Sequence, residues 1–177
     1  DRAVAVAGVM GGANSEVRGQ TTEVLLESAY FIPETVRRTA RRLGLRSEAS
    51  YRFERGVDPL GTLLALDRAA SLLHQLAGGQ VSRGEIDVFP KPLPPTVIPL
   101  RAQRVNSFLG VQIEANEIEQ CVRTLGAKIT RGRGGTWQVT PPSYRADLAQ
   151  EADLIEEVSR LRGYDTFPAF LLCMVVW

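Results

Sequence analysis

The chain has 177 residues, 44% of them hydrophobic, with 21 lysines and arginines against 20 aspartates and glutamates. This composition is typical of a folded globular protein, and the near-zero net charge excludes a protein that binds nucleic acid through overall positive charge. One histidine and two cysteines exclude a disulfide framework and most zinc sites, which favours a reducing, cytoplasmic setting.

Proline marks the main division of the chain. Residues 90–99 hold five of the ten prolines, and a stretch of this kind is extended and semi-rigid. We therefore expect one domain over residues 1–93 and a second over 94–168. Residues 169–177 form an apolar tail that is too short to span a bilayer, and we expect no membrane contact.

In the first segment, the strand-forming residues of 24–31 predict a strand. Proline at the start and glycine after the end predict a helix over residues 33–43. The polar segment 46–59 is expected to be a loop, which either lines a pocket or pairs its own charges. A second helix is predicted from Pro59 to the glycine pair after residue 77, and residues 80–88 predict another strand.

The second segment shows one more strand, two short helices, a glycine-rich hairpin and an amphipathic helix. These elements are predicted over residues 97–100, 101–109, 115–125, 127–140 and 147–162. The order helix, helix, hairpin, helix indicates a small module of winged-helix type. The predicted class of the whole chain is therefore α+β.

Two features of the first segment are candidates for binding chemistry. Residues 8–12, GVMGG, place three glycines in five positions, which suits either close approach to a ligand or a plain tight turn. Glu27 is the acid within the apolar run 24–31. On a buried face its carboxylate requires a partner or a ligand, whereas on an edge strand it faces solvent.

The second segment carries a group of acids: Asp147, Asp153, Glu156 and Glu157. On a helix, Asp153 lies one turn from both glutamates, and like charges so placed repel unless something neutralises them. Mg²⁺ commonly takes one or two such carboxylates. The alternative is a set of acids that favours the helix dipole and faces solvent.

Several long motifs resemble one family. GVMGG, VLLESAYF and ARRLGLRSEASYRFERGVDP resemble the beta subunit of bacterial phenylalanine–tRNA ligase, also called phenylalanyl-tRNA synthetase. The motifs VIPLRAQRVNSFLG, LGAKI, TPPSYRADL and EADLIEEVSRLRGYDTFP resemble the B5 domain of the same subunit. The resemblance covers about residues 1–168. It implies the C-terminal part of a mixed α/β B3/B4 editing domain, followed by a winged-helix-like B5 domain.

The resemblance also implies an activity. The parent ligase joins phenylalanine to tRNA-Phe with ATP and Mg²⁺, and its catalytic alpha subunit completes an alpha2beta2 heterotetramer. Its B3/B4 domain hydrolyses tyrosine that is wrongly attached to this tRNA. Such a second site is needed because a hydrophobic pocket rejects an analogue that merely adds a hydroxyl only ~100-fold.

The resemblance assigns roles residue by residue. It implies that Glu27 reads the tyrosine hydroxyl and that Gly8 shapes the amino-acid pocket. Ser47, which replaces a common threonine, and Ala49 line the same pocket. The four acids of the second segment are implied to bind Mg²⁺ shared with the alpha subunit. We expect no aminoacylation from this segment alone, and no hydrolysis from an incomplete editing pocket.

Two alternatives stay open. The second segment is a nucleic-acid-binding winged-helix module if its arginines gather on one face, although the neutral charge argues against strong binding. These arginines are Arg101, Arg104, Arg123, Arg131 and Arg133. The other alternative is a structural spacer between the editing site and the catalytic subunit.

Overall fold

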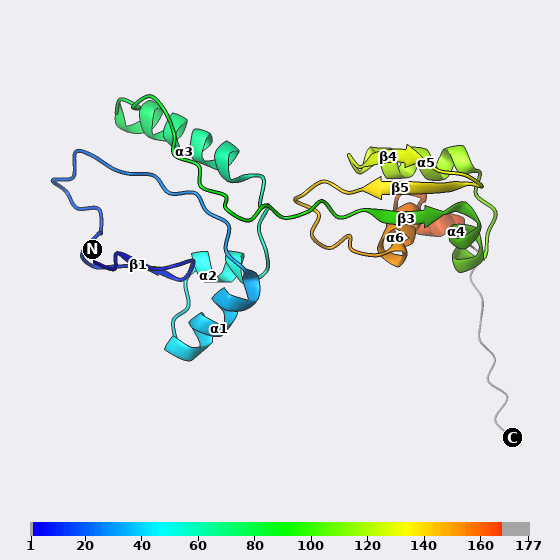
Figure 1. The fold of residues 1–177 in the computed structure, drawn as a ribbon, viewed down its shortest axis with the longest axis horizontal. Coiled ribbons are helices and arrows are strands. Elements are labelled where there is room, and N and C mark those ends of the chain that lie inside the picture. The colour runs from blue at the N-terminus through cyan, green and yellow to red at the C-terminus, as the bar shows by residue number, and fades with distance from the viewer. Residues whose placement is uncertain (1, 168–177) are drawn as a thin grey trace, which may run out of the picture. The chain divides into compact units, whose positions relative to one another are not determined.

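The computed structural model describes residues 2–167, which form two compact units divided between Leu93 and Pro94 (Figure 1). Both units combine helices with a small antiparallel sheet, which confirms the α+β class. No described helix is long and apolar enough to cross a membrane. The apolar tail predicted over residues 169–177 lies outside the described residues.

The first unit contains a two-stranded hairpin and three helices. They are β1 (Ala5–Val6), β2 (Met10–Gly11), α1 (Pro33–Leu43), α2 (Glu48–Phe53) and α3 (Thr62–Ala77). The predicted helix over residues 33–43 is confirmed, and Gly44 ends it in the left-handed conformation at φ 65°.

Helix α3 ends as predicted but begins at Thr62 instead of Pro59. The Asp58 carboxylate accepts the backbone N–H of Leu60 at 2.9 Å, so these residues form a turn before the helix. The polar segment 46–59, predicted as a loop, contains helix α2, because Ser47 caps a short helical stretch there.

The strands predicted over residues 24–31 and 80–88 are wrong for this structure. Neither segment contains regular structure, and no described strand pairs with either of them. Strand propensity reflects packing and pairing with a neighbour, and it does not hold an unpaired segment in a sheet.

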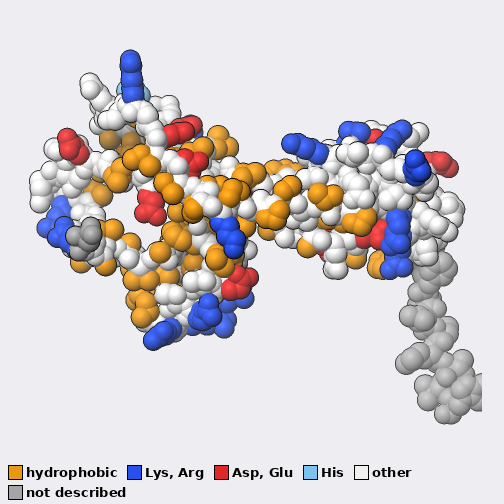
Figure 2. Space-filling model, in the orientation of Figure 1, with side chains coloured by type: hydrophobic (Ala, Val, Ile, Leu, Met, Phe, Trp, Pro, Cys, Tyr) orange, Lys and Arg blue, Asp and Glu red, His pale blue; other side chains and the backbone are white. Residues whose placement is uncertain are grey.

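The core of the first unit is small. Its buried apolar residues, among those that the structure describes, are Val9, Val36 and Ala40. Helix α3 buries none of its residues, and Figure 2 shows hydrophobic side chains on the surface of this unit.

The second unit is built on a three-stranded sheet with the order β3-β5-β4. Its elements are β3 (Ile98–Arg101), α4 (Ala102–Leu109), α5 (Ala115–Thr124), β4 (Lys128–Arg131), β5 (Thr136–Thr140), α6 (Glu151–Arg162) and a 3₁₀ turn at Tyr164–Thr166. The strand, the first two helices and the hairpin confirm the predictions to within one or two residues.

Alternating burial along the strands places the core of the second unit. Ile98 pairs with Val139 and Leu100 pairs with Trp137, and all four side chains are buried on the same face of the sheet. Helices α4 and α6 pack against β3, while α5 packs against β4 and α6. The sheet and the three helices therefore share one core, which includes Leu154 of α6.

Candidate functional site

Gly8 forms the turn between β1 and β2. Its φ of +68° is one that residues with side chains rarely adopt. A β-carbon at this position would lie 2.9 Å from Phe31 Cδ2 and 3.0 Å from Val36 Cγ2. Both the conformation and the space therefore restrict this position to glycine.

Ser47 joins this hairpin to helix α2. Its Oγ accepts the backbone N–H of Ser50 at 3.0 Å, while the Ser50 hydroxyl oxygen accepts the backbone N–H of Ser47 at 2.9 Å. The Ser47 hydroxyl itself donates to the backbone carbonyl of Val9. The hydroxyl thus caps the helix and fixes it beside the Gly8 turn.

The structure brings together two of the four residues predicted to form an editing pocket. Ser47 bonds to Val9 of the small core, and Gly8 lies against Phe31, which forms an edge-to-face pair with Phe53 at a centroid distance of 4.9 Å. Glu27 and Ala49 are exposed, and Glu27 lies on the segment without regular structure. The described residues therefore do not gather Glu27 with Gly8 and Ser47 in one pocket.

Among the four acids of the second unit, Asp147 and Glu157 are paired with arginine. Arg145 binds the Asp147 carboxylate through Nε at 2.9 Å and Nη2 at 2.7 Å, and the same Nη2 lies 2.9 Å from Glu157 Oε1. Glu157 also binds Arg160. The hydrogen bond from Arg145 lowers the pKa of Asp147, and the one from Arg160 is the main cause that lowers the pKa of Glu157.

Asp153 acts as a helix cap. Its Oδ2 accepts the backbone N–H groups of Ala149 at 2.9 Å and Gln150 at 2.8 Å, and the first of these lowers its pKa most. The sequence predicted that this helix begins at Asp147. The cap explains why α6 begins at Glu151 instead. Glu156 is exposed on the same helix.

The chemistry of four carboxylates suits Mg²⁺, but their arrangement does not. Two are held by guanidinium groups and one by backbone amides. No group of three or more acids, histidines or cysteines among residues 2–167 is arranged to hold a metal ion. The residues as placed do not fit the ion, and the Mg²⁺ site stays a prediction.

Sequence reasoning missed a second buried carboxylate. Glu119 of α5 is buried and accepts hydrogen bonds from Arg123, Arg131 and the indole of Trp137. The spacing of Glu119 and Arg123, one helical turn apart, was the available signal. Arg131 and Trp137 lie in the hairpin, and only the folding of the hairpin against α5 brings them to Glu119, so no local sequence pattern indicates these contacts.

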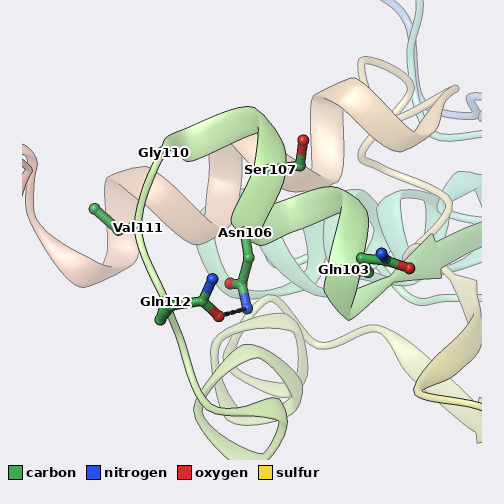
Figure 3. Close-up of a pocket in the computed structure, with 6 residues that line it drawn as sticks. All are labelled: Gln103, Asn106, Ser107, Gly110, Val111 and Gln112. Carbon is green, nitrogen blue, oxygen red and sulfur yellow. Dashed lines mark hydrogen bonds between the residues drawn. The ribbon is translucent and has the colours of Figure 1, made fainter.

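Two surface depressions lie on the second unit. One of about 570 Å³ lies at the end of α4, where Asn106 donates to Gln112 Oε1 at 3.1 Å (Figure 3). Asn106 also bonds the backbone of Ile113, so these groups hold the loop after α4. The other, about 260 Å³, lies between Arg104, Phe108 and the start of α6. Neither is lined by a residue predicted for the editing pocket or the Mg²⁺ site.

The arginines that a nucleic-acid-binding module requires are largely engaged within the unit. Arg101 binds Glu151, while Arg123 and Arg131 both bind Glu119. Side chains paired in this way have less charge to offer to phosphates.

The comparisons with known proteins agree on one family. A model of the B3/4 domain matches residues 1–78, and a model of the tRNA synthetase B5 domain matches residues 98–164. The phenylalanine–tRNA ligase beta subunit of Syntrophus aciditrophicus is 49% identical over 172 residues, which are 95% of this chain and 21% of that protein. That of Geobacter sulfurreducens is 52% identical over 164 residues, 93% of this chain and 20% of that protein. The chain thus spans about a fifth of the length of these relatives, and it belongs to the phenylalanine–tRNA ligase beta-subunit family, of which it covers the B3/4 and B5 part.

Proposed function

We propose that this chain supplies the editing and B5 region of the beta subunit of a cytoplasmic phenylalanine–tRNA ligase. With an alpha subunit, in an alpha2beta2 heterotetramer, the enzyme attaches phenylalanine to tRNA-Phe with ATP and Mg²⁺. The observation that carries the proposal is the identity of about half over nearly the whole chain, with both domain matches in the same order.

Within this proposal, Gly8, Glu27, Ser47 and Ala49 line the pocket that hydrolyses Tyr-tRNA-Phe. The contact of Ser47 with Val9, the neighbour of Gly8, supports a shared pocket wall, because it joins two motifs that are distant in sequence. The exposed carboxylate of Glu27 is available to accept a hydrogen bond from a substrate hydroxyl. Ser47 positions backbone rather than touching substrate, because its hydroxyl already donates and accepts within the protein.

A chimeric enzyme tests the proposal. The matching region of the Geobacter sulfurreducens beta subunit is replaced by this chain and co-expressed with its alpha subunit. We expect an assembled enzyme that aminoacylates tRNA-Phe and deacylates Tyr-tRNA-Phe. A chimera that assembles but lacks both activities would contradict the proposal.

The role of Glu27 is tested in the same enzyme. Glu27→Ala is expected to slow deacylation by about tenfold, as loss of one hydrogen bond to substrate predicts, and to leave aminoacylation intact. Glu23→Ala removes a neighbouring exposed acid and serves as the matched control. Equal effects of the two substitutions would show that Glu27 does not read the substrate.

A further inference from the structure

Arg145 lies between two of the four acids that were predicted to hold a metal ion. Its guanidinium binds Asp147 through two nitrogens and Glu157 through one, at 2.7–2.9 Å for the closest contacts. Asp147 belongs to the loop before α6 and Glu157 to the helix itself. A single side chain therefore neutralises both carboxylates and ties the loop to the helix.

The remaining acceptor capacity of these acids is also largely used. The Glu157 side chain is only 12% exposed and has Arg160 as its second partner, so its charge requires compensation inside the protein. Asp153 uses one oxygen to accept two backbone amides. Of the four acids, only Glu156, which is exposed, lacks a role in this set of contacts.

We propose that Arg145 is the resident counter-ion of this acidic group and that it keeps divalent cations out of the group in this chain. The planar guanidinium matches a carboxylate with two parallel hydrogen bonds, and it is already fixed in place. Mg²⁺ demands near-octahedral geometry and gives up its water reluctantly, so it competes poorly for carboxylates that are already paired. This inference concerns the chain itself and does not depend on the proposed function.

Binding of Mn²⁺, followed by electron paramagnetic resonance on the full chain, tests the inference. The unmodified chain is expected to show no saturable site up to about 1 mM Mn²⁺. Arg145→Gln is expected to gain one saturable site with a Kd of about 0.1 mM or less, at least tenfold below that limit. Added Mg²⁺ should release the ion. Arg101→Gln is the matched control, because it removes the same charge from a different ion pair, with Glu151.

Two results would overturn the inference. One is a Mn²⁺ site in the unmodified chain that is lost in Glu157→Gln. The other is an equal gain of binding in Arg145→Gln and Arg101→Gln, which would mean that net charge alone is responsible. If Arg145→Gln does not fold, Arg145→Lys keeps the charge but loses the paired hydrogen bonds. It is then expected to gain a weaker Mn²⁺ site, and no gain at all would also overturn the inference.

Discussion

Replacing Glu119 by alanine should weaken the packing of α5 against the hairpin of the second unit. The carboxylate accepts hydrogen bonds from Arg123 Nη2 at 2.8 Å, Arg131 Nε at 2.8 Å and Trp137 Nε1 at 3.1 Å. These donors come from α5, β4 and β5, so one buried side chain connects a helix with both strands of the hairpin. We expect the substitution to destabilise the whole unit rather than the helix alone.

The magnitude follows from what each donor does after the change. Trp137 is 4% exposed, and a buried indole N–H without an acceptor costs about 1–3 kcal/mol. The two arginine side chains are 57% and 68% exposed, so they turn to water and lose little. With a urea m value of about 1–2 kcal/mol/M for a unit of this size, a loss of this magnitude should lower the urea midpoint by roughly 0.5–3 M.

Hydrogen exchange as a function of urea measures this effect on the full chain. A peptide covering β5 reports the second unit separately from the first. The variants are Glu119→Ala, Trp137→Phe and the pair together, and Gln120→Ala on the exposed side of α5 is the control. We expect Glu119→Ala to cost less when Trp137 is already phenylalanine, because no indole N–H is then left without an acceptor. Fully additive effects would refute the reasoning.

Three further predictions concern both units. Gly8→Ala should destabilise the first unit more than Gly44→Ala. Both positions have positive φ, but only at Gly8 would the new β-carbon lie 2.9 Å from an aromatic carbon, that of Phe31. The urea midpoints of the two variants measure the difference. Ser47→Ala should lower the stability of the first unit by about 0.5–2 kcal/mol through loss of the cap, while Ser47→Thr retains most of it; thermal unfolding compares the two. Hydrogen bonds from Arg123 and Arg131 lower the pKa of Glu119 in the folded state. The contribution of Glu119 to the stability of the second unit is therefore complete above the pKa of about 4.3 that a glutamate has in the unfolded chain. It is lost as the pH falls through the lower pKa of Glu119 in the folded state. Urea midpoints of the second unit from pH 7 to pH 3 should show this loss, and Glu119→Gln should reduce it.

Local signals predicted the helices well because the relevant interactions are local. Proline at the first position of α1 and a left-handed glycine after its end set both bounds without tertiary contacts. The start of α6 was misplaced because Asp147 looks like a first-turn acid in sequence. In the structure, the Asp153 carboxylate reaches back to the amides of Ala149 and Gln150, so the helix begins at Glu151 and Asp147 stays in the loop before it.

The two strands wrongly predicted for the first unit, over residues 24–31 and 80–88, show where local signals fail, because strand formation depends on a partner that is distant in sequence. The apolar run 24–31 has the composition of a strand, yet the described residues offer it no hydrogen-bonded neighbour. In the second unit, residues 98–101 and 136–140 do form strands, because they pair with each other across the sheet.

The candidate sites also differ in whether they depend on local interactions or on contacts between segments that are distant in sequence. The three glycines of residues 8–12 indicated a turn or a close backbone approach at Gly8, and the structure shows both. The capping role of Ser47 was not predicted, because segment 46–59 was expected to be a loop. The occupation of Asp147 and Glu157 by Arg145 is not readable from residue type and spacing, because it depends on how the loop before α6 folds back onto the helix.

The position of Glu27 links the fold to the proposed editing function. A carboxylate that discriminates one hydroxyl must be held in place, and an unpaired extended segment does not hold it. Leu25, two residues earlier, is 96% exposed, so packing does not hold the backbone next to Glu27, although Phe31 at the end of the segment packs against the small core. The relatives are about five times as long as the matched region, since the chain spans about a fifth of them. If Glu27 reads substrate in the proposed ligase, the segment 24–31 must gain a strand neighbour there. Its backbone amides should then exchange with solvent far more slowly in the chimeric enzyme than in this chain, and equal exchange rates would argue against Glu27 as the discriminating residue.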